Sequence, residues 1–135
     1  MSANVVQQAG RFFVVGSIGF LVDGGILTVL HNLFDFSLLN ARLVSFSAAV
    51  TMTWYLNRQH TFSDSRDSRA MHEWTRYAVV NGIGAMLNLG IFLWLIYRFN
   101  ILASWPIVPL AMAASIALVF NFFASRHLAF RHGQT

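Results

Sequence analysis

Four long apolar runs, separated by short polar segments, dominate the chain. They cover about residues 12–34, 37–56, 77–97 and 105–125. A helix needs roughly 20 mostly apolar residues to cross a hydrocarbon core of about 30 Å, and each run meets that length. The pattern therefore predicts an all-α, polytopic membrane protein whose four transmembrane helices form one membrane domain over residues 1–135.

The composition agrees with this fold class and argues against a soluble helical bundle. Of the 135 residues, 56% are hydrophobic and 10% are charged, whereas a soluble domain carries about 25% charged residues. All nine basic residues are arginines, and the formal net charge is +4. These arginines are scattered singly between apolar runs, so a nucleic-acid partner is not expected, whereas anionic membrane lipids are.

Seven of the nine arginines fall on one side of the predicted membrane. They precede the first run, fill the middle segment and follow the fourth run: Arg11, Arg58, Arg66, Arg69, Arg76, Arg126 and Arg131. Only Arg42 and Arg98 belong to the other side. Because cytoplasmic loops are enriched in arginine, both termini and the middle segment are predicted to be cytoplasmic. Within that segment, SDSRDSRAMHEW predicts a short helix or turn on the surface, and Tyr77 is expected at the inner membrane interface.

The two halves of the chain resemble each other. A first offset, which places Arg11 over Arg76, aligns RFFVVGSIGFLVDGG (11–25) with RYAVVNGIGAMLNLG (76–90), with six identities in fifteen positions. A second offset, slightly longer, places Tyr55 over Phe123 and aligns YLNRQHTF (55–62) with FASRHLAF (123–130). Each half then forms a two-span hairpin that begins inside. The sequence thus predicts two parallel-repeat hairpins, related by a pseudo-axis along the membrane normal.

The second offset also superposes two stripes of small or polar residues. Each stripe repeats every fourth position along one helix face; they consist of Ser45, Ala49 and Thr53, and of Ala113, Ala117 and Asn121. Small residues let helix backbones approach closely in lipid. The stripes indicate either ordinary helix packing or the lining of a pathway, and both interpretations stay open.

These segments resemble the GtrA-like family over nearly the whole chain, with YLNRQHTF as the most specific part. The resemblance implies a small, multi-pass protein of the bacterial inner (cytoplasmic) membrane that acts in cell-surface polysaccharide synthesis. It further implies translocation of a polyprenyl-phosphate-linked sugar across the bilayer. The alternative is a non-transporting scaffold that anchors a membrane glycosyltransferase.

Two charged side chains fall inside the predicted spans, where charge is costly and usually marks a functional or paired site. Asp23 lies near the middle of the first span and Arg42 near the start of the second. Asp23 is interpreted either as a proton relay or cavity organiser, or as a hydrogen-bonded acid within the bundle. Arg42 is interpreted as snorkelling to the outer headgroups, as binding a lipid-linked phosphate, or as pairing with Asp23.

Five further residues complete the candidate substrate-binding set: Asn57, Arg58, Asn88, Asn121 and Arg126. Arg58 and Arg126 are equivalent under the second offset, and inner-leaflet anchoring and the helix macrodipole both favour arginine there. The pseudo-axis would also bring both guanidiniums to one inner mouth, where they suit the carrier phosphate. The three amides can bond either sugar hydroxyls or neighbouring helices.

The remaining chemistry favours a carrier over an enzyme. The five histidines show no metal-binding spacing, and no nucleophile constellation or phosphate-binding glycine loop is recognisable, so no metal, cofactor or catalytic residue is expected. One subunit of four helices offers little room for a sugar path, which makes a homo-oligomer plausible. A small multidrug exporter is a third interpretation, ranked last because such proteins use a glutamate in the first span and often have a balanced charge bias.

Overall fold

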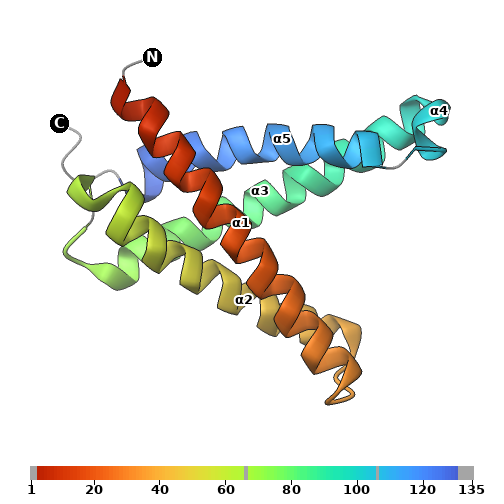
Figure 1. The fold of residues 1–135 in the computed structure, drawn as a ribbon, viewed down its shortest axis with the longest axis horizontal. Helices are drawn as coiled ribbons and strands as arrows, with labels where there is room; N and C mark the ends of the chain where they lie inside the picture. Colours follow the sequence, from red (N-terminus) through yellow and green to blue (C-terminus); the bar gives the residue numbers. More distant parts are fainter. Residues whose placement is uncertain (1–2, 66, 106, 131–135) are drawn as a thin grey trace.

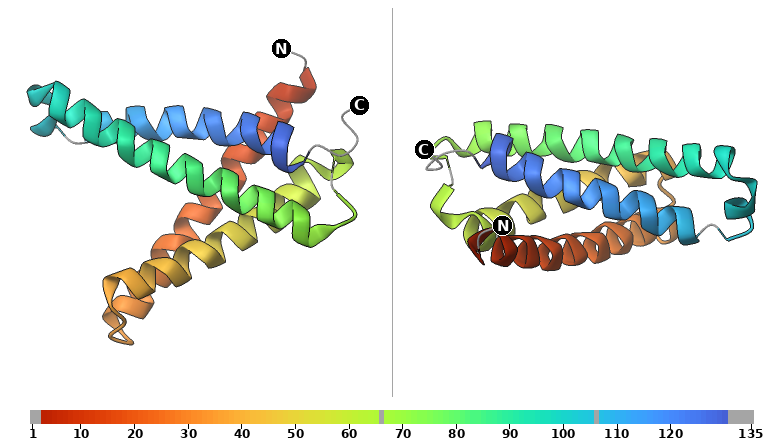
Figure 2. Two further views of the ribbon diagram at one scale, coloured as in Figure 1. Left: turned by 180° about the vertical axis from the view of Figure 1, so that it is seen from behind. Right: turned by 90° about the horizontal axis from the view of Figure 1, so that it is seen from above.

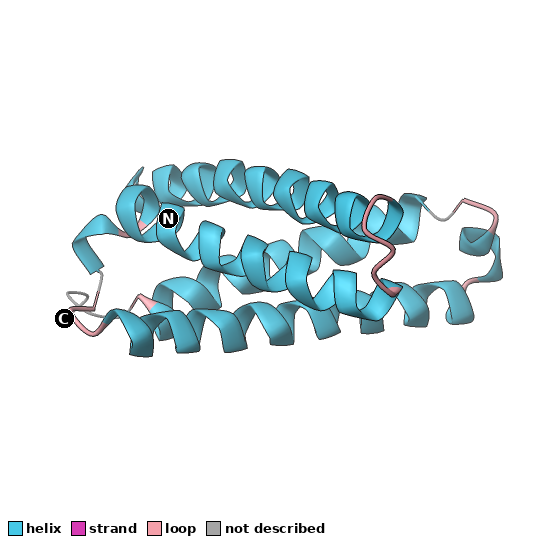
Figure 3. Cartoon of the chain, turned by 90° about the horizontal axis from the view of Figure 1, so that it is seen from below, coloured by secondary structure: helices cyan, strands magenta, loops and turns pink. Residues whose placement is uncertain are grey.

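The computed structural model describes residues 3–65, 67–105 and 107–130. Four long helices account for most of them: α1 (Ala3–Asn32), α2 (Leu38–Leu56), α3 (Ala70–Arg98) and α5 (Ile107–Ala124). Every regular element in these ranges is helical (Figure 3), which confirms the all-α prediction. Arg66 and Arg131, both counted in the topology argument, lie outside the described residues.

Short helical elements cap or connect the long helices. The π-helical turns η1 (Asn57–Thr61) and η3 (Ser125–Ala129) follow α2 and α5 directly, η2 (Ser63–Ser65) is a 3-10 turn, and α4 (Asn100–Ala103) follows α3. In both π turns the next phenylalanine closes the turn. The amide of Phe62 donates to the carbonyl of Asn57, and that of Phe130 to Ser125, each over 2.8 Å. The aligned segments YLNRQHTF and FASRHLAF therefore end their helices in the same way.

The turn between α1 and α2 is built from local hydrogen bonds. The amide of Phe36 donates to the carbonyl of Leu30 over 3.0 Å, and His31 Nδ1 lies 2.9 Å from the carbonyl oxygen of Phe36. Asp35 takes a positive φ of 57°, a conformation that aspartate adopts more readily than most residues. Ser37 then accepts a hydrogen bond from the amide of Asn40 over 3.2 Å and starts α2, as serine commonly does at a helix N-terminus.

The long helices associate in two pairs that diverge from a common end. α1 packs along α2 and α3 along α5, whereas contacts between the two pairs are fewer. Figure 1 and the left view of Figure 2 show the α1–α2 tip well apart from the α3–α5 tip, while the start of α1 and the end of α5 lie near η1. The two pairs therefore meet at one end and open toward the other.

An aromatic cluster joins the pairs at their common end. The rings of Phe62 and Phe130, which follow the two π turns, stack at 4.8 Å with an interplanar angle of 20°. Phe12 packs edge-on against Phe62, and Tyr77 packs edge-on against Phe130. All four side chains are buried. Edge-to-face and offset-stacked rings are the favoured aromatic arrangements, so this cluster gives the two pairs a fixed junction.

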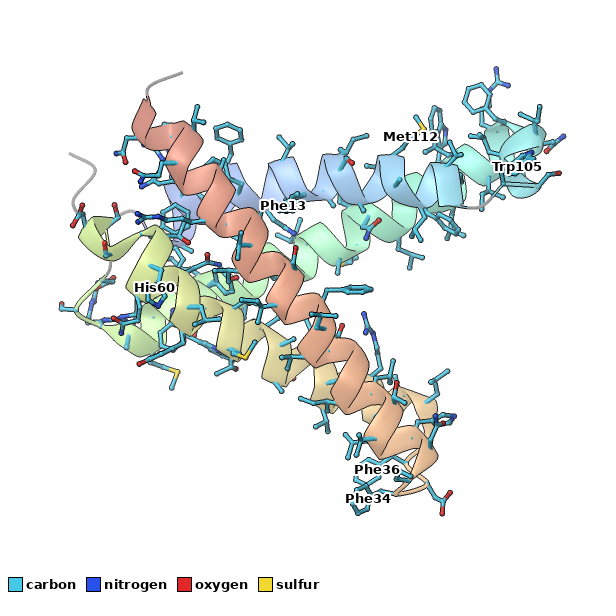
Figure 4. The ribbon with its side chains drawn as sticks, viewed as in Figure 1. Phe13, Phe34, Phe36, His60, Trp105 and Met112 are labelled. Carbon is cyan, nitrogen blue, oxygen red and sulfur yellow. The ribbon has the colours of Figure 1, made fainter. Side chains whose placement is uncertain are left out.

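The surface of the molecule suits lipid. α1, α3 and the stretch Val108–Ala129 are long and apolar enough to cross a membrane, and many large apolar side chains are exposed. In Figure 4, Phe34 and Phe36 lie at the α1–α2 tip, and Trp105 lies at the tip of the other pair. Crossing by the shorter and more polar α2 (19 residues) stays a prediction.

Candidate functional site

A cleft of about 590 Å³, lined mostly by apolar residues with polar side chains among them, lies between the two helix pairs. Side chains from α1, α2, α3 and α5, together with Asn57 of η1, line it. Its polar lining consists of Ser17, Asp23, Arg42, Thr53, Asn57, Tyr77, Asn81, Asn88 and Asn121. Five of the seven residues proposed from the sequence thus share one cleft, although they come from opposite halves of the chain.

The two charged residues that fall inside the predicted spans form an ion pair. Nη1 of Arg42 donates to Oδ2 of Asp23 over 2.7 Å, so the structure bears out the pairing that was one of the interpretations of Arg42. The Asp23 side chain is 16% exposed and that of Arg42 is 52% exposed. The second carboxylate oxygen of Asp23 is buried without a hydrogen-bond partner among the described residues. Only one of the two carboxylate oxygens of Asp23 therefore has a hydrogen-bond partner among the described residues.

A hydrogen-bonded chain centred on Tyr77 occupies the other end of the cleft. The Tyr77 hydroxyl donates to Oγ1 of Thr53 over 3.0 Å, and it accepts from Nδ2 of Asn57 over 3.0 Å. Oδ1 of Asn57 accepts from the hydroxyl of Thr61 over 2.8 Å. The position of Tyr77 at the inner membrane interface stays a prediction; its side chain is 1% exposed and therefore packs inside the protein, which the sequence did not indicate.

Glycines bring the two helices of each pair into close contact. A methyl group at Gly19 would overlap the Thr53 side chain, and one at Gly84 would overlap the carboxamide of Asn121. The first offset aligns Gly19 with Gly84, and the second aligns Thr53 with Asn121. Each pair therefore makes the same glycine contact, as expected where small residues allow helix backbones to approach in lipid.

Arginine contacts at the common end follow the same offsets. Arg11 donates to the carbonyl of His60 over 2.9 Å, and Arg76 donates to the carbonyl of Leu128 over 3.0 Å. Each bond ties the start of one long helix to the π turn that ends its partner. Residues related by the two offsets thus occupy matching positions in the two helix pairs.

Arg58 and Arg126 lie at the common end and are not part of the cleft lining. Nη1 of Arg58 lies 3.2 Å from Oε1 of Glu73, and Nε of Arg126 donates to Oε1 of Gln8 over 2.8 Å. The first offset aligns Gln8 with Glu73. The two arginines therefore make corresponding contacts, each from the end of one pair to the start of the other.

A buried ionic network around Glu73 went unrecognised in the sequence. Its carboxylate is fully buried, and it accepts from Nε1 of Trp54 over 3.0 Å and from the amide of Asp67. Asp67 in turn pairs with Arg76 over 3.1 Å. The prediction that this segment lies on the surface was wrong for Asp67 and Glu73. Mixed charges in a polar loop look solvated in a sequence, and only the fold reveals their burial.

The helices and the cleft define the class of this protein: a multi-pass helical membrane protein with a polar cleft between two helix pairs. Comparison with known families goes further, because the family described as GtrA/DPMS, transmembrane domain, matches residues 11–130. The chain belongs to this family, as the resemblance of its sequence segments predicted. Membership makes it a membrane protein of glycan synthesis.

Proposed function

We propose that this protein carries a polyprenyl-phosphate-linked sugar across the bacterial inner membrane for cell-surface glycan synthesis. In this proposal all four long helices cross the bilayer as two parallel hairpins, with the common end and both termini in the cytoplasm. The described arginines of the common end support this orientation, since arginine is enriched on the cytoplasmic side.

The observation that carries the proposal is the set of polar side chains that line the cleft between the helix pairs. An amphipathic substrate of this kind needs a polar path for its sugar phosphate, while its chain remains in lipid. The cleft provides such a path, because polar side chains line it within helices whose outer surfaces are apolar. Buried polar groups are costly in a membrane and usually mark a substrate pathway.

Arg42 is the residue to which we assign the carrier phosphate. Guanidinium binds phosphate through paired N–H donors, and about half of the Arg42 side chain is exposed. Its partner Asp23 is an anion that a phosphate would replace as the ligand of Arg42. The exchange keeps the guanidinium paired throughout, but it releases the mostly buried Asp23 carboxylate from its partner, and this release is part of its cost.

Phosphate binding by Arg58 and Arg126 stays a prediction, and it can be separated from the role of Arg42. Both guanidiniums have protein partners at the common end, so phosphate capture there would require them to exchange those partners. If they only hold the helix pairs together, Arg58→Ala and Arg126→Ala lower thermal stability. If they capture the carrier, the same variants reduce binding of the lipid phosphate.

Reconstitution in liposomes tests the proposal directly. The purified protein is incorporated with a short-chain polyprenyl-phosphate hexose that carries a label on its sugar, and a membrane-impermeant reagent reports which leaflet holds it. We expect the wild-type protein to speed up the exchange between leaflets and Arg42→Gln to slow it at least tenfold. Arg98→Gln, which changes an arginine beyond the cleft, is the matched control. No acceleration by correctly folded wild-type protein would contradict the proposal.

A scaffold for a membrane glycosyltransferase is the second candidate, because the family to which the chain belongs is described as a transmembrane domain. A pure scaffold would need the exposed helix faces but not the polar cleft. Exchange of the lipid between leaflets without any glycosyltransferase in the liposomes supports the carrier. Glycan synthesis that survives Arg42→Gln but requires the protein would support the scaffold.

A further inference from the structure

The two halves place polar side chains at matching positions, but a tyrosine hydroxyl meets them in only one half. In the first half, Thr53 and Asn57 both bond the hydroxyl of Tyr77. The second offset relates these two residues to Asn121 and Ser125, and the first offset relates Tyr77 to Phe12. The second half therefore presents the same pair of positions to a ring that has no hydroxyl.

The aromatic contacts show that Phe12 occupies the position corresponding to Tyr77. Phe12 packs edge-on against Phe62 at 6.2 Å, and Tyr77 packs edge-on against Phe130 at 5.8 Å. Phe12 also contacts Phe122, the neighbour of Asn121, at 5.5 Å. Its ring therefore lies beside the second-half site but supplies neither a donor nor an acceptor.

Two oxygens of this second site lack partners. Among the described residues, Oδ1 of Asn121 and Oγ of Ser125 are buried and make no hydrogen bond, and Ser125 is fully buried. A buried polar atom without a partner costs about 1–3 kcal/mol, and native structures contain few of them. Asn121 also lines the cleft, but its Oδ1 lies against Gly84, so a molecule in the cleft reaches this oxygen only when the carboxamide turns.

We propose that Asn121, with Ser125 behind it, forms a subsite that binds a hydroxyl group of the transported sugar. This proposal rests on the proposed function and specifies how the sugar is recognised. The Asn121 carbonyl oxygen accepts hydrogen bonds only. A phosphate monoanion or dianion offers mainly acceptor oxygens, whereas a sugar hydroxyl donates. The subsite therefore suits the neutral, hydroxylated part of the substrate. Arg42, in the same cleft, would bind the phosphate.

The Gly84 contact explains how Asn121 is held in place. Its carboxamide rests against Gly84 so closely that any side chain there would displace it. In the first half, the smaller Thr53 rests against Gly19 and its hydroxyl is already used by Tyr77. Only the second half thus combines an extended amide that lines the cleft with an acceptor oxygen that has no partner among the described residues.

Equilibrium binding in lipid nanodiscs tests the subsite. The probes are farnesyl phosphate, farnesyl phosphoglucose and farnesyl phosphomannose. The net value of one hydrogen bond, about 0.5–1.5 kcal/mol, corresponds to roughly 3–10-fold in affinity. We expect wild-type protein to bind at least one glycosylated lipid tighter than farnesyl phosphate by that factor. Asn121→Ala removes the preference, so that neither glycosylated lipid binds tighter than farnesyl phosphate.

A second variant keeps the test decisive if Asn121→Ala folds poorly. Phe12→Tyr supplies the missing hydroxyl from the protein itself, as Tyr77 does in the first half. We expect it to raise the midpoint of thermal unfolding and to abolish the preference for the glycosylated lipid. Phe34→Tyr is the matched control, because Phe34 is more than half exposed and does not line the cleft, and it should leave both properties unchanged.

The outcomes separate the subsite from the proposed function. A preference that Asn121→Ala and Phe12→Tyr both retain would overturn the subsite, as would equal binding of all three lipids by the wild type; water alone would then occupy the two acceptors. In either case the carrier function stands if Arg42→Gln weakens binding of every lipid. Failure of the wild-type protein to bind any of the three lipids would overturn both proposals.

Discussion

The Asp23–Arg42 ion pair has two members with unequal access to water. Loss of Arg42 leaves a mostly buried carboxylate, whereas loss of Asp23 leaves a guanidinium that is half exposed and able to extend toward the headgroups. Breaking a fully buried pair costs about 3–5 kcal/mol, so for this partly exposed one we expect Arg42→Gln to lower the unfolding free energy by about 2 kcal/mol. Asp23→Asn should cost less than half as much. Thermal unfolding in detergent, followed by circular dichroism, measures both.

The double variant Asp23→Asn/Arg42→Gln provides the control for this prediction. With both charges removed, neither group is left unpaired, so most of the loss caused by Arg42→Gln should be recovered. Coupling between two contacting residues appears as such non-additivity. Equal losses for the two single variants, or strictly additive losses in the double variant, would contradict the unequal pairing.

Single residues differ in how far the sequence alone revealed them. Asp23, Arg42 and the amides were recognisable because polar groups in apolar helices are costly. That they share a cleft required the structure, because the contacts join residues far apart in the chain. Tyr77 and Glu73 were missed for the opposite reason. A tyrosine at a span end and a glutamate in a polar loop fit ordinary surface positions, and only their burial gives them a structural role.

The helix pairs depend on the close contacts at Gly19 and Gly84. Alanine at either position forces its methyl group into Thr53 or Asn121, and overpacking of this kind typically costs about 1–3 kcal/mol. We expect Gly19→Ala and Gly84→Ala to lower the unfolding free energy by that amount. Urea or SDS titration in mixed micelles, monitored by tryptophan fluorescence, measures the change.

Other glycines of the same helices serve as matched controls. Gly25 and Gly90, which the first offset also aligns, have open space where a methyl group would point. Alanine there should stabilise each helix by up to about 1 kcal/mol through its higher helix propensity. Thr53→Ser should rescue Gly19→Ala, since it removes the overlapping methyl group and keeps the hydroxyl that Tyr77 bonds. Equal losses at all four glycines would contradict a specific role for the close contacts.

The existence of the four long helices could be predicted from the sequence, but the residues at which they begin could not. Long apolar runs of about 20 residues predict the four helices, because a helix satisfies its backbone hydrogen bonds within one segment in lipid. The starts of α1 and α3 lie well before the predicted runs, since polar residues continue the helix into the common end. The π turns were visible only as two aligned motifs, because a π turn depends on a backbone hydrogen bond that no residue pattern specifies.

At the scale of the whole molecule, contacts at the common end determine how the two helix pairs are arranged relative to each other. The sequence offsets predict that the pairs match, and matching contacts occur at the glycines, at the arginines and in the aromatic cluster. The divergence of the pairs could not be predicted, because it depends on how tightly Phe62, Phe130 and their neighbours pack. The cleft follows from this divergence and is therefore a property of the assembled fold.

The orientation of all four helices can be tested with single cysteines, because the chain contains none of its own. Asn4, Asp64 and Asn100 are exposed and lie near the start of α1, between α2 and α3, and after α3. We expect Asn100→Cys to react with a membrane-impermeant maleimide in spheroplasts. Asn4→Cys and Asp64→Cys should react only after the membrane is permeabilised, because the common end faces the cytoplasm in the proposed topology.

The comparison of Asn4 with Asp64 decides whether α2 crosses. The membrane-spanning part of α1 and the whole of α2 lie between these two positions, so two crossings return the chain to its original side and one crossing does not. The question is open for α2, because it is not among the described helices that are long and apolar enough to cross a membrane. Labelling of Asn4→Cys and Asp64→Cys from opposite sides would leave α2 on the membrane surface. The observed packing of α1 along α2 favours the other result, because a crossing helix that packs antiparallel along its length takes its partner across with it.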